Sequence, residues 1–383
     1  MIKENSDLLS LIEVLLKDPL EFERIGGHDK IIESGLTYSH LRGLIKRIYD
    51  INENQLIETS NANSGMIGLL NSLSTGSRKR KFNHRVDRQK PGKTYFKIYV
   101  EGDSWFQFPV FQKDIIDWLN RNDDFLIYSD AYGGDWITNI LYEQQYITAL
   151  STYSPNFFLI SGGGNDLVGS HRLGIMVDRK SNYAKKKYQT ISDIKSDLLN
   201  MVQKEMILTA QTFLNKEFYA IINLFKLQYS LLFSDLYHPK SKQKHIITIT
   251  HGYDFPFPSP KRRFSIRYPL QPFLNSMVDS GNWLYTPLMV KGILNRDDQL
   301  AIMLAMIYEF GEMMSSFAKT YKNIYHVDSR GFAQTPRDWF DELHLKSHNF
   351  HKIARAYETI IRNHSSLKDK VIRTAKAQPL KTE

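Results

Sequence analysis

The run YFKIYVEGDSW, residues 95–105, decides the fold class of this chain of 383 residues. It begins with an apolar, β-rich stretch over residues 95–100 and passes through Gly102 into a polar turn that carries Ser104. An apolar strand ending in such a turn is typical of a buried parallel strand, and ligands bind where parallel strands end. The same pattern, an apolar strand followed by a polar turn, recurs further along the chain.

Four more short β-rich runs follow, at residues 125–128, 156–160, 245–250 and 324–327. Helical patterns separate most of them, for example at residues 112–122 and 137–150. Near-continuous apolar strands that alternate with helices predict a parallel sheet covered on both faces. Five strands with right-handed crossovers therefore predict an α/β fold, a three-layer α/β/α sandwich with a five-stranded parallel sheet.

The remaining parts of the chain divide around this sandwich. We expect a helical N-terminal region (1–75), a basic linker (76–94), the main domain (95–363) and a polar tail (364–383). Two stretches of the main domain exceed what crossovers need, and they are read as insertions at about 169–243 and 252–296. The first is helical, with one long pattern from about residue 191 to 236, and the second is rich in proline and aromatic residues. Lids, packing elements and partner surfaces all remain open for them.

The net charge and the amino-acid composition restrict the classes of function that this protein can have. The net charge is +9, and much of the positive excess lies between Arg78 and Lys93. We interpret this run as a solvated linker. The less favoured interpretation is a contact for nucleic acid or an anionic surface. The absence of cysteine excludes disulfides, thiolate zinc sites and cysteine nucleophiles. The first 18 residues predict an amphipathic helix and no export signal, so we expect the cytoplasm.

Four loops rich in glycine and in polar or charged residues follow the predicted strands. Their sequences are GDSW after the first strand, AYGGD after the second, GGGND after the third and DELH after the last, at residues 102–105, 131–135, 162–166 and 341–344. Since the carboxyl ends of parallel strands lie along one edge of a sheet, we expect the four loops to share that edge.

Together these loops supply what acyl transfer requires. Ser104 is the candidate nucleophile, at a turn into a following helix whose N-terminus favours negative charge. His344 is the candidate base, and Asp341, one helical turn earlier, can orient its imidazole. The N–H groups of Ser104 and Gly134 and the side-chain amide of Asn165 are candidate oxyanion donors.

Other polar residues compete for these roles. Asp338 is a rival acid, although its spacing to the histidine makes a helix cap the better interpretation. His348 and His351 recur at helical spacing after His344, but they read as a helix surface and no metal site is predicted. His251 at the end of the fourth strand is interpreted either as a structural histidine or as a substrate contact.

The four loops also carry a family resemblance. GDSW, the GGD turn, GGND and DELH match, in order, the four blocks of the SGNH (GDSL) hydrolases, over about residues 95–363. The resemblance implies the flavodoxin-like fold of that family, with Ser104, His344 and Asp341 as the catalytic triad and Gly134 and Asn165 as oxyanion donors. Two residues depart from the family pattern. Trp105 stands where leucine or isoleucine is common in the family, and Leu345 stands where proline is common.

The sequence thus predicts a serine esterase that works through an acyl-Ser104 intermediate on a small-molecule, lipid or carbohydrate ester. No cofactor is expected, because the glycine run at residues 162–164 lacks the features of a P-loop or a dinucleotide fingerprint. The alternatives are an acyltransferase or a sugar or lipid deacylase at the same site. A non-enzymatic role of the basic linker in binding nucleic acid or another anionic partner is a third possibility.

Overall fold

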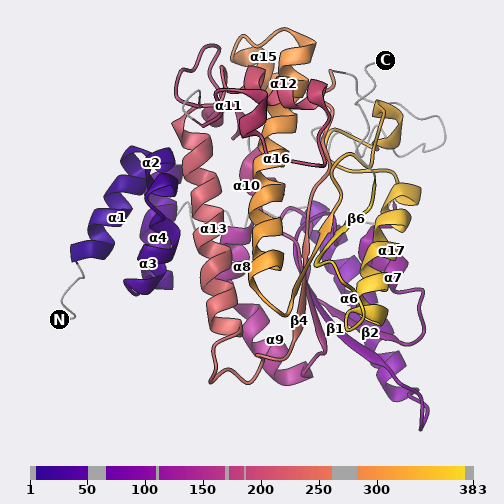
Figure 1. The fold of residues 1–383 in the computed structure, drawn as a ribbon. Coiled ribbons are helices and arrows are strands. Elements are labelled where there is room, and N and C mark those ends of the chain that lie inside the picture. Colours follow the sequence, from indigo (N-terminus) through magenta and orange to yellow (C-terminus); the bar gives the residue numbers. More distant parts are fainter. Residues whose placement is uncertain are drawn as a thin grey trace.

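A six-stranded, fully parallel sheet forms the centre of the protein (Figure 1). The computed structural model describes residues 6–50, 66–108, 112–168, 172–184, 187–260 and 283–375. The strand order is β2-β1-β3-β4-β5-β6. The strands span Phe96–Glu101 (β1), Phe125–Ser129 (β2), Phe157–Ile160 (β3), Ile247–His251 (β4), Ile324–Asp328 (β5) and Val371–Arg373 (β6).

Helices make up most of the rest of the described chain. Before the sheet come α1 (Ser6–Lys17), α2 (Pro19–Arg24), α3 (Gly27–Glu33), α4 (Tyr38–Tyr49) and α6 (Met66–Asp87). Within the sheet domain lie α7 (Ile115–Leu119), α8 (Ile137–Glu143), α9 (Gln145–Tyr153), α10 (Gly164–Val168), α11 (Leu173–Met176), α12 (Met201–Ala210), α13 (Lys216–Leu236), α15 (Tyr285–Val290), α16 (Arg296–Thr320) and α17 (Ser347–Asn363). Two short 3₁₀ turns, Ile191–Asp193 and Pro336–Asp338, complete the set.

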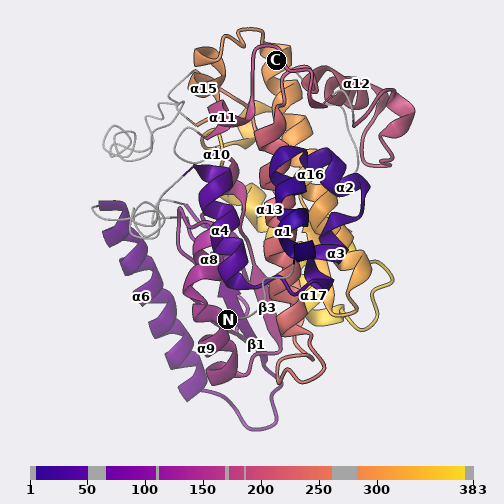
Figure 2. The same ribbon diagram turned by 90° about the vertical axis from the view of Figure 1, so that its left-hand side faces the viewer.

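The helices cover both faces of the sheet. Helices α8, α9, α13 and α16 lie on one face, whereas α7 and α17 pack together on the other (Figure 1). Helices α1 to α4 form an additional layer outside α13, where their leucines and isoleucines share a second core with Leu224, Leu227 and Leu231 (Figure 2). The predicted α/β/α sandwich is therefore confirmed, with an extra helical layer.

All five predicted strands are present within two residues of the expected ends, and all are parallel. The predicted strand number is wrong by one, because β6 adds to the edge beside β5, with Val371 paired to His326. This strand lies in the segment assigned to the polar tail. It has only three residues with charged neighbours, so it carries too little apolar pattern to be recognised as a strand.

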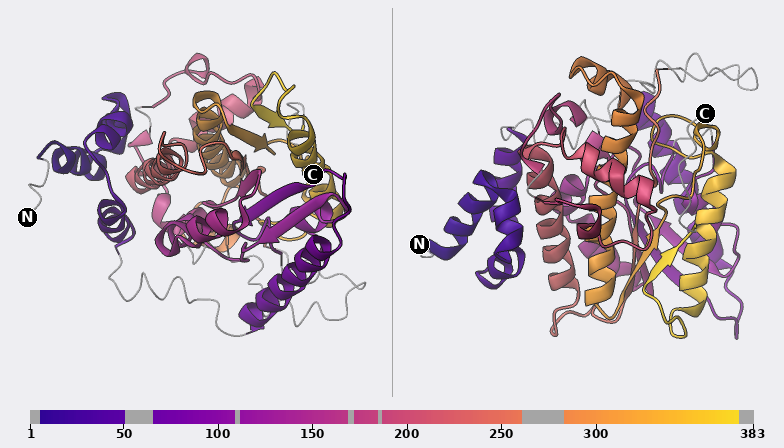
Figure 3. Two further views of the ribbon diagram at one scale, coloured as in Figure 1. Left: turned by 90° about the horizontal axis from the view of Figure 1, so that it is seen from below. Right: turned by 45° about the horizontal axis from the view of Figure 1, so that its top comes forward.

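The predicted basic linker, 76–94, differs most from the structure. Its first twelve residues belong to α6, which runs along the edge strand β2 (Figure 3). Lys81 donates to the carbonyl of Asn120 at 2.6 Å, and Arg85 donates to the carbonyl of Phe125 at 2.8 Å. These basic side chains therefore bind backbone carbonyls, one at the C-terminal end of α7 and one on the edge strand β2, where a carbonyl would otherwise lack a partner. Residues 51–65 of the predicted N-terminal region lie outside the described residues.

The first insertion is a packing element. Its predicted single helical pattern divides into α12 and α13, and fifteen residues of α13 are buried between the N-terminal helices and the sheet-covering layer. Among the described residues, one helix, α16, has the length and composition of a membrane span. Of its most apolar stretch 89% is buried inside the protein, as in a core helix.

Candidate active site

Ser104 lies in a tight turn directly after β1. Gly102 at the strand end has φ +153°, and a Cβ there would lie 2.7 Å from the carbonyl oxygen of Ser161, so the backbone needs glycine at this position. The N–H groups of Phe106 and Gln107 both donate to the carbonyl of Asp103. The predicted helix at Ser104 is thus wrong: residues 103–107 form a single turn, and helix-dipole stabilisation of the nucleophile does not apply.

A buried carboxylate holds this turn in place. Asp103 is 1% exposed and accepts hydrogen bonds from the Ser161 hydroxyl at 2.8 Å, the Trp105 N–H at 3.1 Å and the Tyr253 hydroxyl. Burial raises the pKa of Asp103 above its ordinary value, while the three donors oppose that rise. Tyr253 comes from the HGYD stretch, residues 251–254, at the end of β4. The family resemblance predicts a pocket element there, and Tyr253 and Asp254 line a cavity together with Ser104.

Ser104, His344 and Asp341 form a continuous hydrogen-bonded chain. The Oγ of Ser104 lies 2.7 Å from the Nε2 of His344. On the other side of the ring, Nδ1 lies 2.8 and 3.0 Å from the two carboxylate oxygens of Asp341. The histidine and aspartate side chains are only 5% and 4% exposed. This is the geometry in which a carboxylate orients an imidazole and the imidazole can accept a hydroxyl proton.

The loop that carries Asp341 and His344 is not helical, although the sequence predicts that Asp341 lies one helical turn before His344. Asp341 Oδ1 instead accepts the backbone N–H groups of Leu343 and His344, at 2.8 and 2.7 Å, and so folds the loop back on itself. The carboxylate of the rival Asp338 accepts the N–H groups of Gln334 and Thr335, and so completes the capping box of the 3₁₀ turn Pro336–Asp338, which Asp338 ends.

Asn165 and Ser104 line the same cavity. The Nδ2 of Asn165 donates to the carbonyl of Asp135 at 2.8 Å, which uses one of its two amide protons and leaves the other for a reacting oxygen. Gly134, with φ +96°, lies in the turn after β2 and is not among the residues that line this cavity. The structure therefore brings two of the three predicted oxyanion donors to the cavity.

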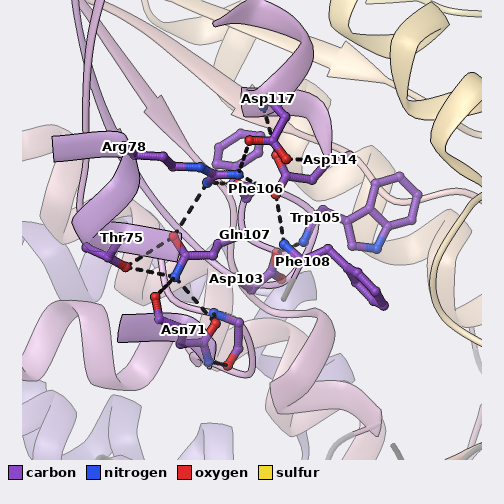
Figure 4. A network of polar contacts seen from close by, with 11 residues as sticks. Asn71, Thr75, Arg78, Asp103, Trp105, Phe106, Gln107, Phe108, Asp114 and Asp117 are labelled. Carbon is purple, nitrogen blue, oxygen red and sulfur yellow. Dashed lines mark hydrogen bonds and ion pairs between the residues drawn. The ribbon is translucent and has the colours of Figure 1, made fainter. Parts of the chain in front are cut away.

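Helix α6 supports both loops that flank this site (Figure 4). Arg78 donates to the carbonyl of Phe106 at 2.6 Å and to the buried carboxylate of Asp114 at 2.5 Å. Asn71 donates to the carbonyl of Gly133 at 3.0 Å and accepts the Gly133 N–H at 3.2 Å. Helix α6 thus positions the turn of Ser104 through Arg78 and the neighbouring glycine turn through Asn71. Arg78 is 4% exposed, so it is not presented to a nucleic acid.

The cavity beside Ser104 is narrow and has an apolar wall. About 40 Å³ is open to the centre of a water-sized sphere. The apolar wall consists of Leu167, Val168, Met303, Met306, Ile307 and Leu343. By the same measure one water needs roughly 10–15 Å³, so the space accepts a group of about three heavy atoms.

Glu342, beside Asp341 in the loop, is 3% exposed and accepts four backbone N–H groups. They belong to Ser259, Trp283, Leu284 and Tyr285, at 2.8 to 3.2 Å. Glu342 thus joins two separate parts of the second insertion, Ser259 and residues 283–285, to the loop of His344. Residues 261–282 of that insertion lie outside the described residues.

The remaining histidines have structural surroundings. His251 is 1% exposed, lies 2.7 Å from the hydroxyl of Tyr357 and packs against Trp105 with ring centroids 4.8 Å apart. Burial lowers its pKa well below the ordinary value, so it is neutral. His351 stacks on Trp118 on the exposed side of α17. Within the described ranges, no group of three or more histidine and acidic side chains is arranged to hold a metal ion.

Comparison with known proteins gives remote likeness only. No family model matches the sequence, and no curated protein matches it. Three of the similar solved structures illustrate the likeness. A protein assigned as an acylhydrolase from Bacteroides fragilis is 13% identical, with 75% of this chain and 96% of that chain covered and a TM-score of 0.33. A mutant acetylxylan esterase from Geobacillus stearothermophilus is 12% identical, with 70% and 94% covered and a TM-score of 0.36.

A GDSL-like lipase from Bacteroides thetaiotaomicron is 12% identical, with 76% and 99% covered and a TM-score of 0.32. The similar structures thus include hydrolases of the kind that the four loops resemble. At these TM-scores the likeness carries no weight for the site, whose geometry is independent of it.

Proposed function

We propose that this protein is a serine hydrolase that cleaves acyl esters through an acyl-Ser104 intermediate. The observation that carries the proposal is the chain from the Ser104 hydroxyl through both nitrogens of His344 to Asp341. A serine hydroxyl becomes an effective nucleophile when a neighbouring base can take its proton, and here the base is 2.7 Å away.

The reaction has two halves. Oγ of Ser104 attacks the ester carbonyl carbon as its proton passes to Nε2 of His344, and the carbonyl oxygen becomes an oxyanion. The Ser104 N–H and the free amide proton of Asn165 stabilise this oxyanion. When the intermediate collapses, the C–O bond to the alcohol breaks and His344 returns the proton to the leaving alcohol. Water then attacks the acyl carbon as one of its protons passes to His344. The bond from this carbon to Oγ of Ser104 breaks, and His344 returns the proton to Oγ as the acid is released.

The narrow cavity favours a short acyl group. A space for about three heavy atoms accepts an acetyl group, whereas a longer chain would have to displace Met303 or Met306. We therefore expect kcat/KM for p-nitrophenyl esters to be highest for acetate and to fall steadily from butyrate to octanoate.

The test is the change Ser104→Ala, with the exposed Ser151→Ala on α9 as the matched control. Ser104→Ala should abolish turnover of p-nitrophenyl acetate and labelling by a fluorophosphonate probe, with an unchanged circular dichroism spectrum. Ser151→Ala should behave as the unchanged protein. Equal rates for the two variants would refute the proposal.

An acyltransferase is the second candidate, because the apolar wall beside Ser104 favours an alcohol with an apolar stem over water as the acceptor. Turnover of p-nitrophenyl acetate in the presence of glycerol or a xylo-oligosaccharide distinguishes the two. A hydrolase releases mainly acetate, whereas a transferase gives mainly the acetylated alcohol. Both outcomes require Ser104.

A further inference from the structure

The segment that follows Ser104 in the sequence holds the backbone on both sides of His344. The indole Nε1 of Trp105 donates to the carbonyl of Leu343 at 3.2 Å, and the side-chain Nε2 of Gln112 donates to the carbonyl of Leu345 at 2.7 Å. The partners of these two bonds are 238 and 233 positions apart. Leu343 and Leu345 are the chain neighbours of His344, so the two bonds enclose the histidine.

The bonds within the histidine loop cannot set its distance from the nucleophile. Asp341 accepts the N–H groups of Leu343 and His344, which fixes the shape of the loop itself. Only contacts with the segment of Ser104 can fix the separation of its Oγ from the Nε2 of His344, which is 2.7 Å. The bonds from Trp105 and Gln112 are contacts of this kind, because they join the two segments directly.

Trp105 has no freedom to turn its N–H elsewhere. Its side chain is buried and packs among the rings of His251, Tyr253 and Phe350, with centroids 4.8 to 5.5 Å away. A leucine or isoleucine at position 105 would fill part of this space but would have no donor. Tryptophan therefore adds a bond to the histidine loop that an aliphatic residue cannot make.

The segment that carries these donors is itself fixed from its other side. Arg78 binds the carbonyl of Phe106, and the N–H of Phe108 donates to the carboxylate of Asp114 at 2.9 Å. The rings of Trp105 and Phe108 lie on the side away from Arg78 (Figure 4). The Phe108 ring packs against the imidazole of His344, with centroids 4.7 Å apart. The donors thus extend from an anchored base.

We propose that Trp105 and Gln112 are positioning residues, which act through the carbonyls of Leu343 and Leu345 to keep His344 within proton-transfer distance of Ser104. We call these two bonds the histidine clamp. The proposal rests on the hydrolase function proposed above, because a proton must pass from Oγ to Nε2 over a short distance. A displacement of about 1 Å can lower a rate ~100-fold, so a small movement of the loop is sufficient to slow the reaction.

Gln112→Met gives the clearest test, because it removes the donor and keeps the length of the side chain. Gln112 is half-buried and is not among the described residues that line the cavity beside Ser104, so substrate binding should be unaffected. Loss of one neutral hydrogen bond corresponds to roughly 2- to 10-fold, and kcat for p-nitrophenyl acetate should fall by this factor with KM unchanged. Gln112→Lys keeps an N–H donor of similar reach and should restore kcat.

Trp105→Phe removes the second donor but keeps an aromatic ring in the packed site, and kcat should fall by a similar factor. The matched control is Trp118→Phe. The indole of Trp118 donates to the carbonyl of Ser347 at 2.9 Å, at the start of α17 and beyond the clamp. Trp118→Phe should lower Tm as much as Trp105→Phe but leave kcat unchanged. An unchanged kcat in Gln112→Met, or an equal loss of kcat in Trp118→Phe, would overturn the proposal.

Hydrogen exchange measured by NMR tests the clamp without any ester turnover. The backbone N–H of His344 is closed onto Asp341, and it should exchange roughly 2- to 10-fold faster in Gln112→Met and in Trp105→Phe, because the loop opens more readily. Equal exchange rates in the variants and the unchanged protein overturn the clamp. Faster exchange in the variants, with no turnover by the unchanged protein, supports the clamp and refutes the hydrolase function.

Discussion

The change Arg78→Met tests whether helix α6 supports the active site or is merely attached to it. Arg78 and Asp114 are 4% and 0% exposed and lie 2.5 Å apart. Removing the cation leaves Asp114 buried without its partner, which typically costs about 3–5 kcal/mol. An unfolding entropy of about 2.1 cal/mol/K per residue over 383 residues converts this loss to a fall in Tm of roughly 4–6 °C.

The loss of stability in Arg78→Met should depend on pH and should be larger at high pH than at low pH. Burial already raises the pKa of Asp114 in the unchanged protein, although Arg78 opposes this rise, so loss of the cation in the variant raises the folded-state pKa further above the unfolded value. Such a group contributes stability below the unfolded pKa and loses it as pH rises through the folded pKa. The difference in Tm between the unchanged protein and the variant should therefore be larger at pH 8 than at pH 5.

Activity should fall as well, because Arg78 also holds the carbonyl of Phe106, two residues after Ser104. A displacement of the nucleophile by about 1 Å can lower the rate ~100-fold. The assays are differential scanning fluorimetry from pH 5 to 8 and kcat/KM for p-nitrophenyl acetate. Arg80→Met, on the exposed side of the same helix, is the matched control. If Arg78→Met and Arg80→Met have equal Tm and kcat/KM, the supporting role of α6 is wrong.

Four further predictions concern the active site, strand β1 and helix α4. Asp341→Asn should lower kcat/KM for p-nitrophenyl acetate by about 10⁴-fold because the imidazole loses its orienting carboxylate; a loss below 10-fold would contradict this role. Gly102→Ala should lower the free energy of unfolding by about 1–3 kcal/mol, because its Cβ would meet the Ser161 carbonyl at 2.7 Å. Gly43→Ala, in the interior of α4 with open space around it, should raise that free energy by about 0.5–1 kcal/mol. Urea denaturation of both variants checks the two signs. Burial raises the pKa of Glu101 to about 8, above its unfolded value, so its contribution to stability is lost as pH rises from about 5 to 8. Tm of Glu101→Gln should therefore fall less over this range than Tm of the unchanged protein, and parallel curves would show that Glu101 does not titrate there.

The parts of the fold that the sequence predicts well are those determined by local pattern. The apolar runs of β1 to β5 and the polar turns after them depend on neighbouring residues, and the parallel topology then brings Ser104 and His344 to one edge although 240 positions separate them. The two local conformations at the site were predicted wrongly, as helices. Both are turns closed by their own polar groups, the carbonyl of Asp103 and the carboxylate of Asp341.

The parts that could not be predicted depend on long-range contacts. Arg78 looks like one basic residue among many in a polar segment, and only the edge of β2 and the distant Asp114 give it a buried role. Tyr253 carries no sign of its bond to Asp103, 150 residues earlier. Gln112 likewise gives no sign of its bond to the carbonyl of Leu345, 233 residues later.

The four bonds of Glu342 have a practical consequence for protein engineering. Ser259 on one side and Trp283 on the other meet at a single carboxylate, so the two ends of the intervening chain are held a few ångströms apart by the protein itself. Glu342 is therefore a position to leave unchanged in any redesign of the residues between Ser259 and Trp283, because its carboxylate fixes both of these residues beside the loop of His344.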